Sequence, residues 1–121
     1  MTEQKRIDAS GYTYAHEHLH IDLSAFKNNI DCRLDQYDLI CAEMNSLYEQ
    51  GVRNIIEMTN RYMGRNPQFM LNIMRDTGMN VMACTGYYQH DFFPSHVATT
   101  SAEKLAKEMI DEIEIGIDGT E

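Results

Sequence analysis

Three histidines at alternate positions give residues 11–20 the chemistry of a metal site. The segment has the sequence GYTYAHEHLH, and its tyrosines and threonine favour extended backbone, so we expect a β-strand over 11–19. Alternate side chains of a strand share one face, which would place His16, His18 and His20 together. Neutral imidazoles two residues apart can reach one ion and suit zinc, iron, nickel or copper. His16 and His18 are therefore the candidate metal ligands, although a bare His-x-His pair also occurs in proteins that bind no metal.

Several other polar residues have a structural role as the simpler explanation. His20 continues the alternation as a candidate third ligand, but we favour a pocket or helix-capping role for it. Glu17 should face the helical side of the strand, where a buried carboxylate needs a hydrogen-bond partner. Arg61 and Arg65 follow the second expected strand, where they would meet an anionic substrate or lie in solvent. We favour solvent for both arginines.

An aromatic segment at 87–96, YYQHDFFPSH, holds the remaining candidates. His90, Asp91 and His96 resemble a second metal cluster, but loop histidines beside a proline are mostly solvated. The aromatic residues of the segment would pack the loop down as a local hydrophobic cluster. The segment follows an expected strand, so it would lie at the end of a sheet where ligands bind.

Apolar periodicity divides the chain into alternating strands and helices. Beyond the first strand, strands are predicted at 52–59 and 80–86, and helices at 36–50, 66–78 and 100–116. Residues 1–10 should fray as a polar leader, and 20–34 should be irregular. Asp35, Asn66 and Thr100 are the predicted N-caps, and a glycine follows each helix as its terminator. The apolar stripe of the third helix is predicted to be buried.

The order β-α-β-α-β-α predicts parallel strands joined by right-handed crossovers. An open doubly wound sheet and part of a (β/α)₈ barrel both fit this order. The first strand is followed by HEHLH and not by the G-x-G-x-x-G of a dinucleotide fold. Histidines at strand ends are typical of a barrel active site, yet a barrel takes about 200–250 residues. With 121 residues, an α/β chain of this barrel class would hold the N-terminal three units of a TIM barrel, incomplete as given.

Composition restricts the class of partner. The net charge is −9 and the pI is about 4.9, which argues against nucleic acid or an anionic membrane as a partner. The three cysteines have no CxxC spacing, as expected of free thiols in a reducing compartment. There is no apolar signal segment and no run long enough for a membrane helix. We therefore expect a cytoplasmic protein.

Four segments of the chain resemble the phosphotriesterase-like family of the amidohydrolase superfamily. They fall in the family's order over residues 11–121, as GYTYAHEHLH, GVRNIIEMTNRYMGRN, NVMACTGYY and EIEIGIDGTE. The resemblance implies a (β/α)₈ barrel with one or two divalent metals, usually zinc, and hydrolysis of ester-type bonds in a small molecule by metal-activated water. It assigns His16 and His18 to the strand-one ligand pair and Tyr88 to an aromatic position of the substrate pocket, for which local packing of the loop is an equal alternative. It places a carboxylate on strand four, histidines on strands five and six, and an aspartate on strand eight.

The resemblance ends before strand four. Residues 11–121 would be the first part of a single hydrolase domain, with no catalytic acid or base among them. The alternative is a non-catalytic metal-binding or interaction piece that needs a partner chain. Three parallel strands leave sheet edges and apolar faces open, so we expect the chain alone to be inactive and to self-associate.

Overall fold

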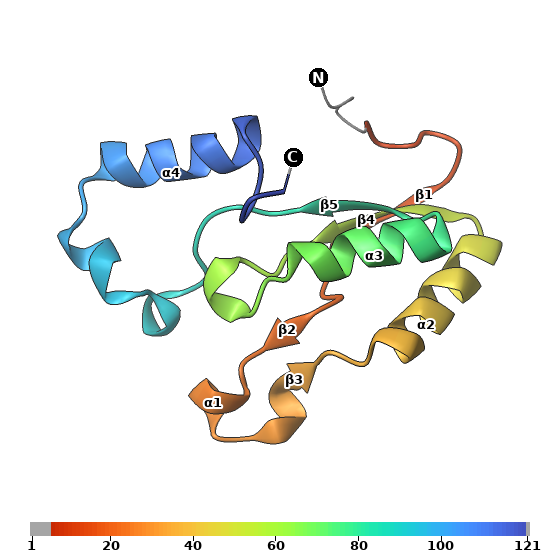
Figure 1. The fold of residues 1–121 in the computed structure, drawn as a ribbon, viewed down its shortest axis with the longest axis horizontal. Helices are drawn as coiled ribbons and strands as arrows, with labels where there is room; N and C mark the ends of the chain where they lie inside the picture. The colour runs from red at the N-terminus through yellow and green to blue at the C-terminus, as the bar shows by residue number, and fades with distance from the viewer. Residues whose placement is uncertain (1–5, 121) are drawn as a thin grey trace.

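Three parallel strands form the central sheet of the chain, of which the computed structural model describes residues 6–120 (Figure 1). The strands are β1 (Tyr12–Glu17), β4 (Val52–Glu57) and β5 (Asn80–Ala83). β4 lies in the middle and pairs with both neighbours. Parallel pairing confirms the topology predicted from the alternating strands and helices, and it brings the carboxyl ends of all three strands to one edge.

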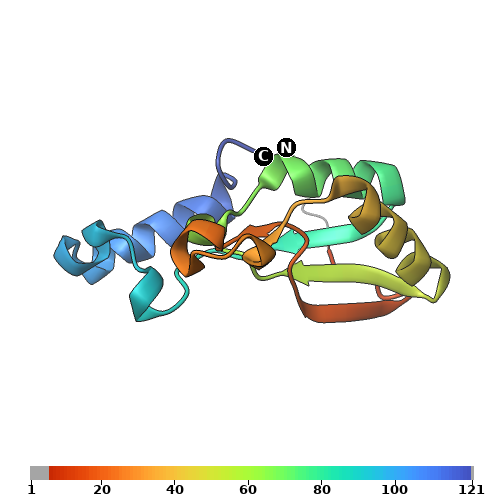
Figure 2. The same cartoon turned by 90° about the horizontal axis from the view of Figure 1, so that it is seen from below.

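Two helices cover one face of this sheet. α2 (Tyr37–Glu49) and α3 (Pro67–Thr77) lie on the same side of the strands (Figure 2). They pack on each other and against β4 and β5. Ile55 and Ile73 lie fully buried where strand and helix meet. The rest of the apolar core surrounds them and consists of Leu19, Ile40, Met44, Val52, Phe69, Met70, Met79 and Val81.

The helix boundaries follow local capping chemistry. Asn66 caps α3 as predicted, since its side chain accepts a hydrogen bond from the Phe69 backbone N–H, and Pro67 begins the helix. The predictions for the other two caps are wrong. Asp35 instead pairs with Arg33, and α2 begins without a side-chain cap. At α4 (Ala102–Glu114) the cap is Ser101, whose hydroxyl accepts from the Lys104 N–H.

Residues 20–34 are more regular than expected. They form a small antiparallel hairpin of β2 (Ile21–Asp22) and β3 (Arg33–Leu34), which is joined by α1 (Ser24–Lys27). The hairpin strands are two residues long, too short for a periodic pattern to reveal. The chain also has four short 3₁₀ turns, η1 (Ile30–Cys32), η2 (Arg61–Met63), η3 (His90–Phe92) and η4 (Ser95–Thr99).

The start of the described chain is bound to the sheet. Asp8 exchanges two hydrogen bonds with the buried side chain of Asn54, at 2.8 and 2.9 Å. Asn80 donates to the carbonyl of Arg6 at 3.1 Å and to Asn54 at 3.0 Å. The expectation of a frayed leader is therefore wrong from Arg6 onward, and residues 1–5 lie outside the described residues. Polar side chains of β4 and β5 thus form hydrogen bonds with a segment that lies outside the strand ladder.

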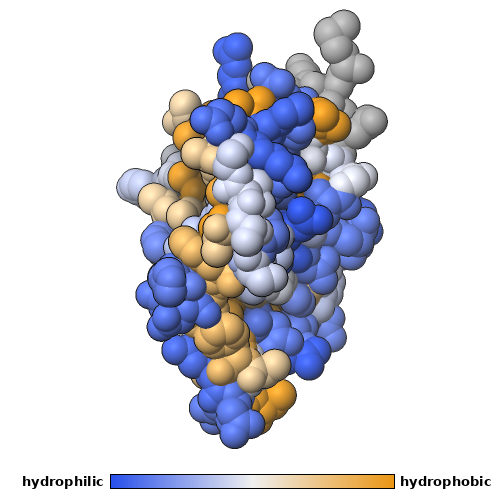
Figure 3. Space-filling view, turned by 90° about the vertical axis from the view of Figure 1, so that its left-hand side faces the viewer, coloured by the Kyte–Doolittle hydropathy of each residue, from blue (hydrophilic) through white to orange (hydrophobic). Residues whose placement is uncertain are grey.

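The last helix, α4, lies apart from the layer formed by α2, α3 and the sheet (Figure 1). The prediction of a buried apolar stripe on it is wrong for this structure, because Ile110 and Ile113 are 49% and 65% exposed. Ile115, just after the helix, is 71% exposed. Apolar residues gather in a band on the side of the molecule seen in Figure 3. The longest helices of residues 6–120 have 13 residues, and none of them could cross a membrane.

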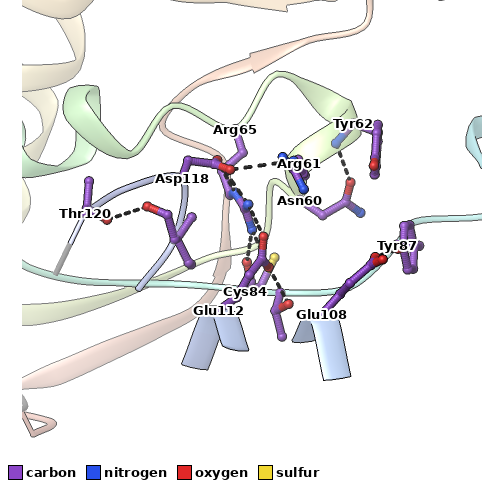
Figure 4. Close-up of polar contacts among 12 residues, drawn as sticks. Asn60, Arg61, Tyr62, Arg65, Cys84, Tyr87, Glu108, Glu112, Asp118 and Thr120 are labelled. Atoms are coloured by element: carbon purple, nitrogen blue, oxygen red, sulfur yellow. Dashed lines mark hydrogen bonds and ion pairs between the residues drawn. The ribbon is translucent and has the colours of Figure 1, made fainter. Parts of the chain in front are cut away.

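One buried cation fastens the C-terminal part of the chain to the sheet. The Arg65 side chain is fully buried and donates to both carboxylate oxygens of Glu112, at 2.5 and 3.0 Å (Figure 4). It also donates to Asp118, at 3.0 and 3.2 Å, and to the carbonyl of Cys84 at 3.1 Å. The prediction of a solvated Arg65 is therefore wrong. It holds for Arg61, whose side chain is 58% exposed.

We expect Arg65→Ala to lower the free energy of unfolding of the full-length protein by about 3 kcal/mol. Breaking a buried ion pair from one side removes about 3–5 kcal/mol, and Glu112 and Asp118 keep some access to water. Arg61→Ala is the matched control and should change stability by about 0.5 kcal/mol or less. Urea titration followed by circular dichroism measures both. Equal stabilities of the two variants would contradict the role given to Arg65.

We also expect the 121-residue chain, prepared alone, to self-associate. Ile110, Ile113 and Ile115, on and just after α4, are exposed, and exposed apolar surface favours association. Light scattering should give a mass above the 14.0 kDa of one chain, and Ile113→Lys should reduce it. Asn45→Lys adds the same charge at an exposed polar position of α2 and should leave the mass unchanged. A cooperatively folded monomer with metal-dependent turnover would refute this expectation.

Candidate metal centre

The rings of His16 and His18 lie together at the carboxyl end of β1. Their centroids are 5.7 Å apart and the planes meet at 73°. His16 is within the strand and exposed, whereas His18 follows the strand and is about two-thirds buried. The register between β1 and β4 shifts between Tyr14 and Glu17, so strict alternation does not carry through this stretch. The two rings nevertheless come together as predicted, while their role as metal ligands stays a prediction.

Residues at and just after the end of β4 hold the His18 ring through hydrogen bonds. Its Nδ1 atom lies 2.8 Å from the hydroxyl oxygen of Thr59. The Thr59 hydroxyl in turn donates to Oε1 of Glu57 at 2.5 Å. Thr59 and Glu57 are both fully buried. The direct separation of His18 Nδ1 and Glu57 Oε1 is 3.9 Å, so the hydroxyl links the ring to the carboxylate.

Glu57 is the buried carboxylate of this site, and the sequence analysis did not single it out. Besides the Thr59 hydroxyl, it accepts from the backbone N–H groups of Leu19 at 3.3 Å and Thr59 at 3.2 Å. Burial raises the pKa of Glu57 to about 7, although these hydrogen bonds act in the opposite direction. The available signal was a lone acid in the apolar run VRNIIEMT. The prediction placed the buried acid at Glu17 instead, which is only half-buried.

The charge state of His18 follows from its surroundings. Burial lowers the pKa of His18 below its ordinary value, and the electrostatic interaction with His16 lowers it further, against a smaller opposite effect of Glu17. The neutral ring is therefore favoured at neutral pH. A neutral imidazole has one nitrogen with a free lone pair, which is the form that binds a metal ion.

His20 does not join the histidine pair. Its Nδ1 lies 2.7 Å from the carbonyl of Gly64, and its ring packs on Phe69 with centroids 5.0 Å apart. Gly64 has φ +85°, and a Cβ there would lie 2.8 Å from the backbone nitrogen of Asp22. Because Gly64 has no side chain, the β2–β3 hairpin packs closely on the loop after β4, which places His20 against α3. The structural role is therefore the one observed for His20.

The loop after β5 carries the other candidates, and they remain apart. His90 and Asp91 are almost fully exposed, as predicted. His96 lies 3.3 Å from the hydroxyl of Tyr87, whose pKa is raised to about 12 by burial and by its hydrogen bond to Glu108. Among residues 6–120, no three histidine, cysteine or acidic side chains are placed to hold one ion.

Tyr88, the candidate substrate-pocket residue, is 52% exposed and lies edge-on to Phe92 with ring centroids 5.2 Å apart. Phe92 also stacks on Phe26 of α1, with centroids 4.2 Å apart. Both interpretations of Tyr88 remain available, because its ring packs locally and still faces solvent.

A separate cleft of about 280 Å³ lies between the loop after β4, the loop after β5 and α4. Arg61, Tyr62 and Tyr87 border it, and the rings of the two tyrosines stack at 5.8 Å (Figure 4). Its carboxylates already have partners within the chain, since Tyr87 donates to Glu108 and Arg65 donates to Glu112.

Comparison with known proteins identifies relatives of this chain. A sequence profile of the phosphotriesterase family matches residues 2–121. The phosphotriesterase homology protein of Escherichia coli is 75% identical over 114 residues, which cover 94% of this chain and 39% of that protein. An aryldialkylphosphatase of Saccharolobus solfataricus is 28% identical over 113 residues, covering 91% of this chain and 36% of its own length. The chain thus spans less than two fifths of the length of each of these two relatives.

A solved structure of the Escherichia coli phosphotriesterase homology protein, with phosphate in its active site, superposes with a TM-score of 0.93 at 74% identity. The match covers 94% of this chain and 39% of that one. The α/β fold described above therefore corresponds to the N-terminal part of a phosphotriesterase-like TIM barrel, as predicted. From the family profile, the identity and the shared fold together, this chain belongs to the phosphotriesterase family.

Proposed function

We propose that His16 and His18 are ligands of a divalent metal ion, with zinc as the expected ion, in a hydrolase of ester-type bonds. The observation that carries the proposal is the pair of rings 5.7 Å apart at the carboxyl end of a parallel strand, where barrel enzymes have their active sites. Residues 11–121 would then be the first part of one barrel domain that holds one or two metals.

The donor set fits such an ion. Both side chains are imidazoles, the burial of His18 favours its neutral form, and the ring of His16 is open to solvent. Zinc sites take nitrogen ligands in sets of three or four. Two histidines supply part of such a set, so full activity would need further ligands from beyond the described residues.

The chemistry would be attack of water on a phosphorus or carbonyl centre. A bound divalent metal lowers the pKa of its water and polarises the substrate oxygen. In this chain, His16 and His18 bind and orient without transferring protons. Thr59 and Glu57 hold the His18 ring at its protein-facing nitrogen.

An ester or phosphoester of a small molecule is the proposed substrate class. The names of the relatives support it, one being an aryldialkylphosphatase and another having been solved with phosphate in its active site. Parallel assays with an activated phosphotriester, a lactone and an aryl ester would separate the subclasses. The cytoplasm is the proposed location, and the free thiols of Cys32, Cys41 and Cys84 support it.

Replacing either histidine tests the metal assignment. In the full-length protein, His16→Ala or His18→Ala should lower the bound metal and reduce hydrolysis by orders of magnitude, because each removes a ligand. Elemental analysis after dialysis gives the metal content, and turnover of the activated esters gives the activity. His90→Ala is the matched control, since that histidine is 95% exposed and pairs only with Asp91.

The outcomes separate the proposal from its alternatives. Unchanged metal content in His16→Ala and His18→Ala would refute the ligand assignment. Metal lost from both variants, in a wild-type protein that hydrolyses none of the three ester classes, would support a non-catalytic metal-binding protein instead.

Metal affinity should depend on pH through His18. Protons compete with the metal for imidazole nitrogen, and the pKa of His18 is shifted downward from 6.5. The affinity for the metal should therefore stay level from pH 8 to about 6.5 and fall only at lower pH. Chelator competition at fixed ionic strength measures the dissociation constant at each pH. A loss of His18-dependent binding already complete at pH 7 would contradict the lowered pKa.

A further inference from the structure

The hydrogen bonds behind His18 form a chain of three side chains with one consistent assignment of hydrogens when Glu57 is ionised. His18 Nδ1 lies 2.8 Å from Thr59 Oγ1, and Thr59 Oγ1 lies 2.5 Å from Glu57 Oε1. Thr59 and Glu57 have no exposed surface. Water therefore cannot replace either partner without a rearrangement of the strand end.

The Thr59 hydroxyl has a single hydrogen, and the geometry commits it to Glu57. An ionised carboxylate only accepts hydrogen bonds. Both oxygens of Glu57 do so, with Oε1 receiving the Leu19 N–H at 3.3 Å and Oε2 receiving the Thr59 N–H at 3.2 Å. Once its hydrogen points to Glu57, Thr59 Oγ1 can meet His18 only as an acceptor. The hydrogen between His18 and Thr59 must then lie on His18 Nδ1.

A neutral imidazole with its hydrogen on Nδ1 has a bare lone pair on Nε2. We propose that Thr59 and Glu57 are positioning residues that fix His18 in the Nδ1–H tautomer and so present Nε2 as its metal-binding atom. This inference rests on the proposed function and deepens it, because it assigns the ligand atom and the two residues that select it. Neither positioning residue contacts the ion in this arrangement.

Backbone hydrogen bonds of the sheet fix the position of Glu57, the acceptor at the end of this hydrogen-bonded series. Glu57 is the last residue of β4, and its backbone carbonyl accepts from the Cys84 N–H at 3.1 Å. The next residue, Met58, donates to the carbonyl of Glu17 at 2.8 Å. β4 is thus held on both sides where Glu57 leaves it. A ligand oriented from such a position keeps its direction before any metal arrives.

The chain contains two internal references for the tautomer. His20 Nδ1 faces the carbonyl of Gly64 at 2.7 Å, and a carbonyl only accepts, so His20 should also carry its hydrogen on Nδ1. His90 is 95% exposed and serves as a solvent-exposed reference. Neither histidine touches Thr59 or Glu57, so neither should respond to a change there.

The test is proton–nitrogen correlation spectroscopy of the histidine rings in the metal-free full-length protein at about pH 9, where Glu57 is ionised. His18 and His20 should both show the Nδ1–H pattern in the wild type. Thr59→Val keeps the shape of the side chain and removes the hydroxyl, so His18 should lose the pure Nδ1–H pattern while His20 keeps it. Thr59→Ser restores a hydroxyl and should restore the His18 pattern.

Zinc affinity by chelator competition is the second measurement. Thr59→Val should weaken zinc binding by about 10- to 100-fold, the usual effect of removing a partner of a metal ligand, and Thr59→Ser should recover most of it. An Nε2–H pattern of His18 in the wild type would overturn the inference without any variant. Unchanged affinity and unchanged His18 pattern in a folded Thr59→Val protein would overturn it too.

These outcomes stay distinct from failure of the proposed function. If His18→Ala leaves the zinc content unchanged, the metal assignment fails, and the ligand-atom inference fails with it. If His18→Ala removes zinc while Thr59→Val alters neither tautomer nor affinity, the metal site stands and only the positioning role of Thr59 and Glu57 is refuted.

Discussion

The parallel pairing of β4 with β1 and β5 is the constraint on which the rest of the structure depends. Because all three strands run the same way, Glu17, Glu57 and Ala83 end at one edge of the sheet. The residues that follow are thereby brought together although they are about forty positions apart in sequence, as with His18 and Thr59. Chemistry at the carboxyl ends of parallel strands is a consequence of this geometry.

The convergence of the strand ends places a buried acid, Glu57, next to His18, and burying this acid is unfavourable in free energy. Glu57 is satisfied by a hydroxyl and two backbone N–H groups, and burial still raises its pKa to about 7. A carboxylate in such surroundings destabilises the fold relative to an apolar residue. Substitution of Arg65 or of the histidines would leave this unfavourable contribution of Glu57 to the free energy of folding in place. Perturbed pKa values of this kind cluster at functional sites.

The sequence was sufficient for the order of elements, the parallel topology and the His16–His18 pair, because each depends on a local pattern such as apolar periodicity or the His-x-His spacing. It was insufficient wherever partners come from distant segments. The role of Arg65 depends on Glu112 and Asp118, about fifty positions away. The position of His20 depends on Gly64 and Phe69. The cap at Ser101 was displaced by one residue because Thr100 bonds the carbonyl of His96 instead.

Among residues 6–120, buried Arg65 and Glu57 show two ways in which the fold accommodates a charged side chain. Arg65 is surrounded by two carboxylates and a carbonyl, which together offset the burial of its charge and tie α4 to the loop after β4. Glu57 has only neutral donors in direct contact, and its hydrogen-bonded chain leads outward through Thr59 to a half-exposed histidine. Burying an ion costs desolvation of its charge, which is offset only when its hydrogen bonds are complete, as they are around Arg65. Glu57 instead reaches the ring of His18 through the Thr59 hydroxyl, and hydrogen-bonded series of this kind commonly orient histidines that bind metal ions.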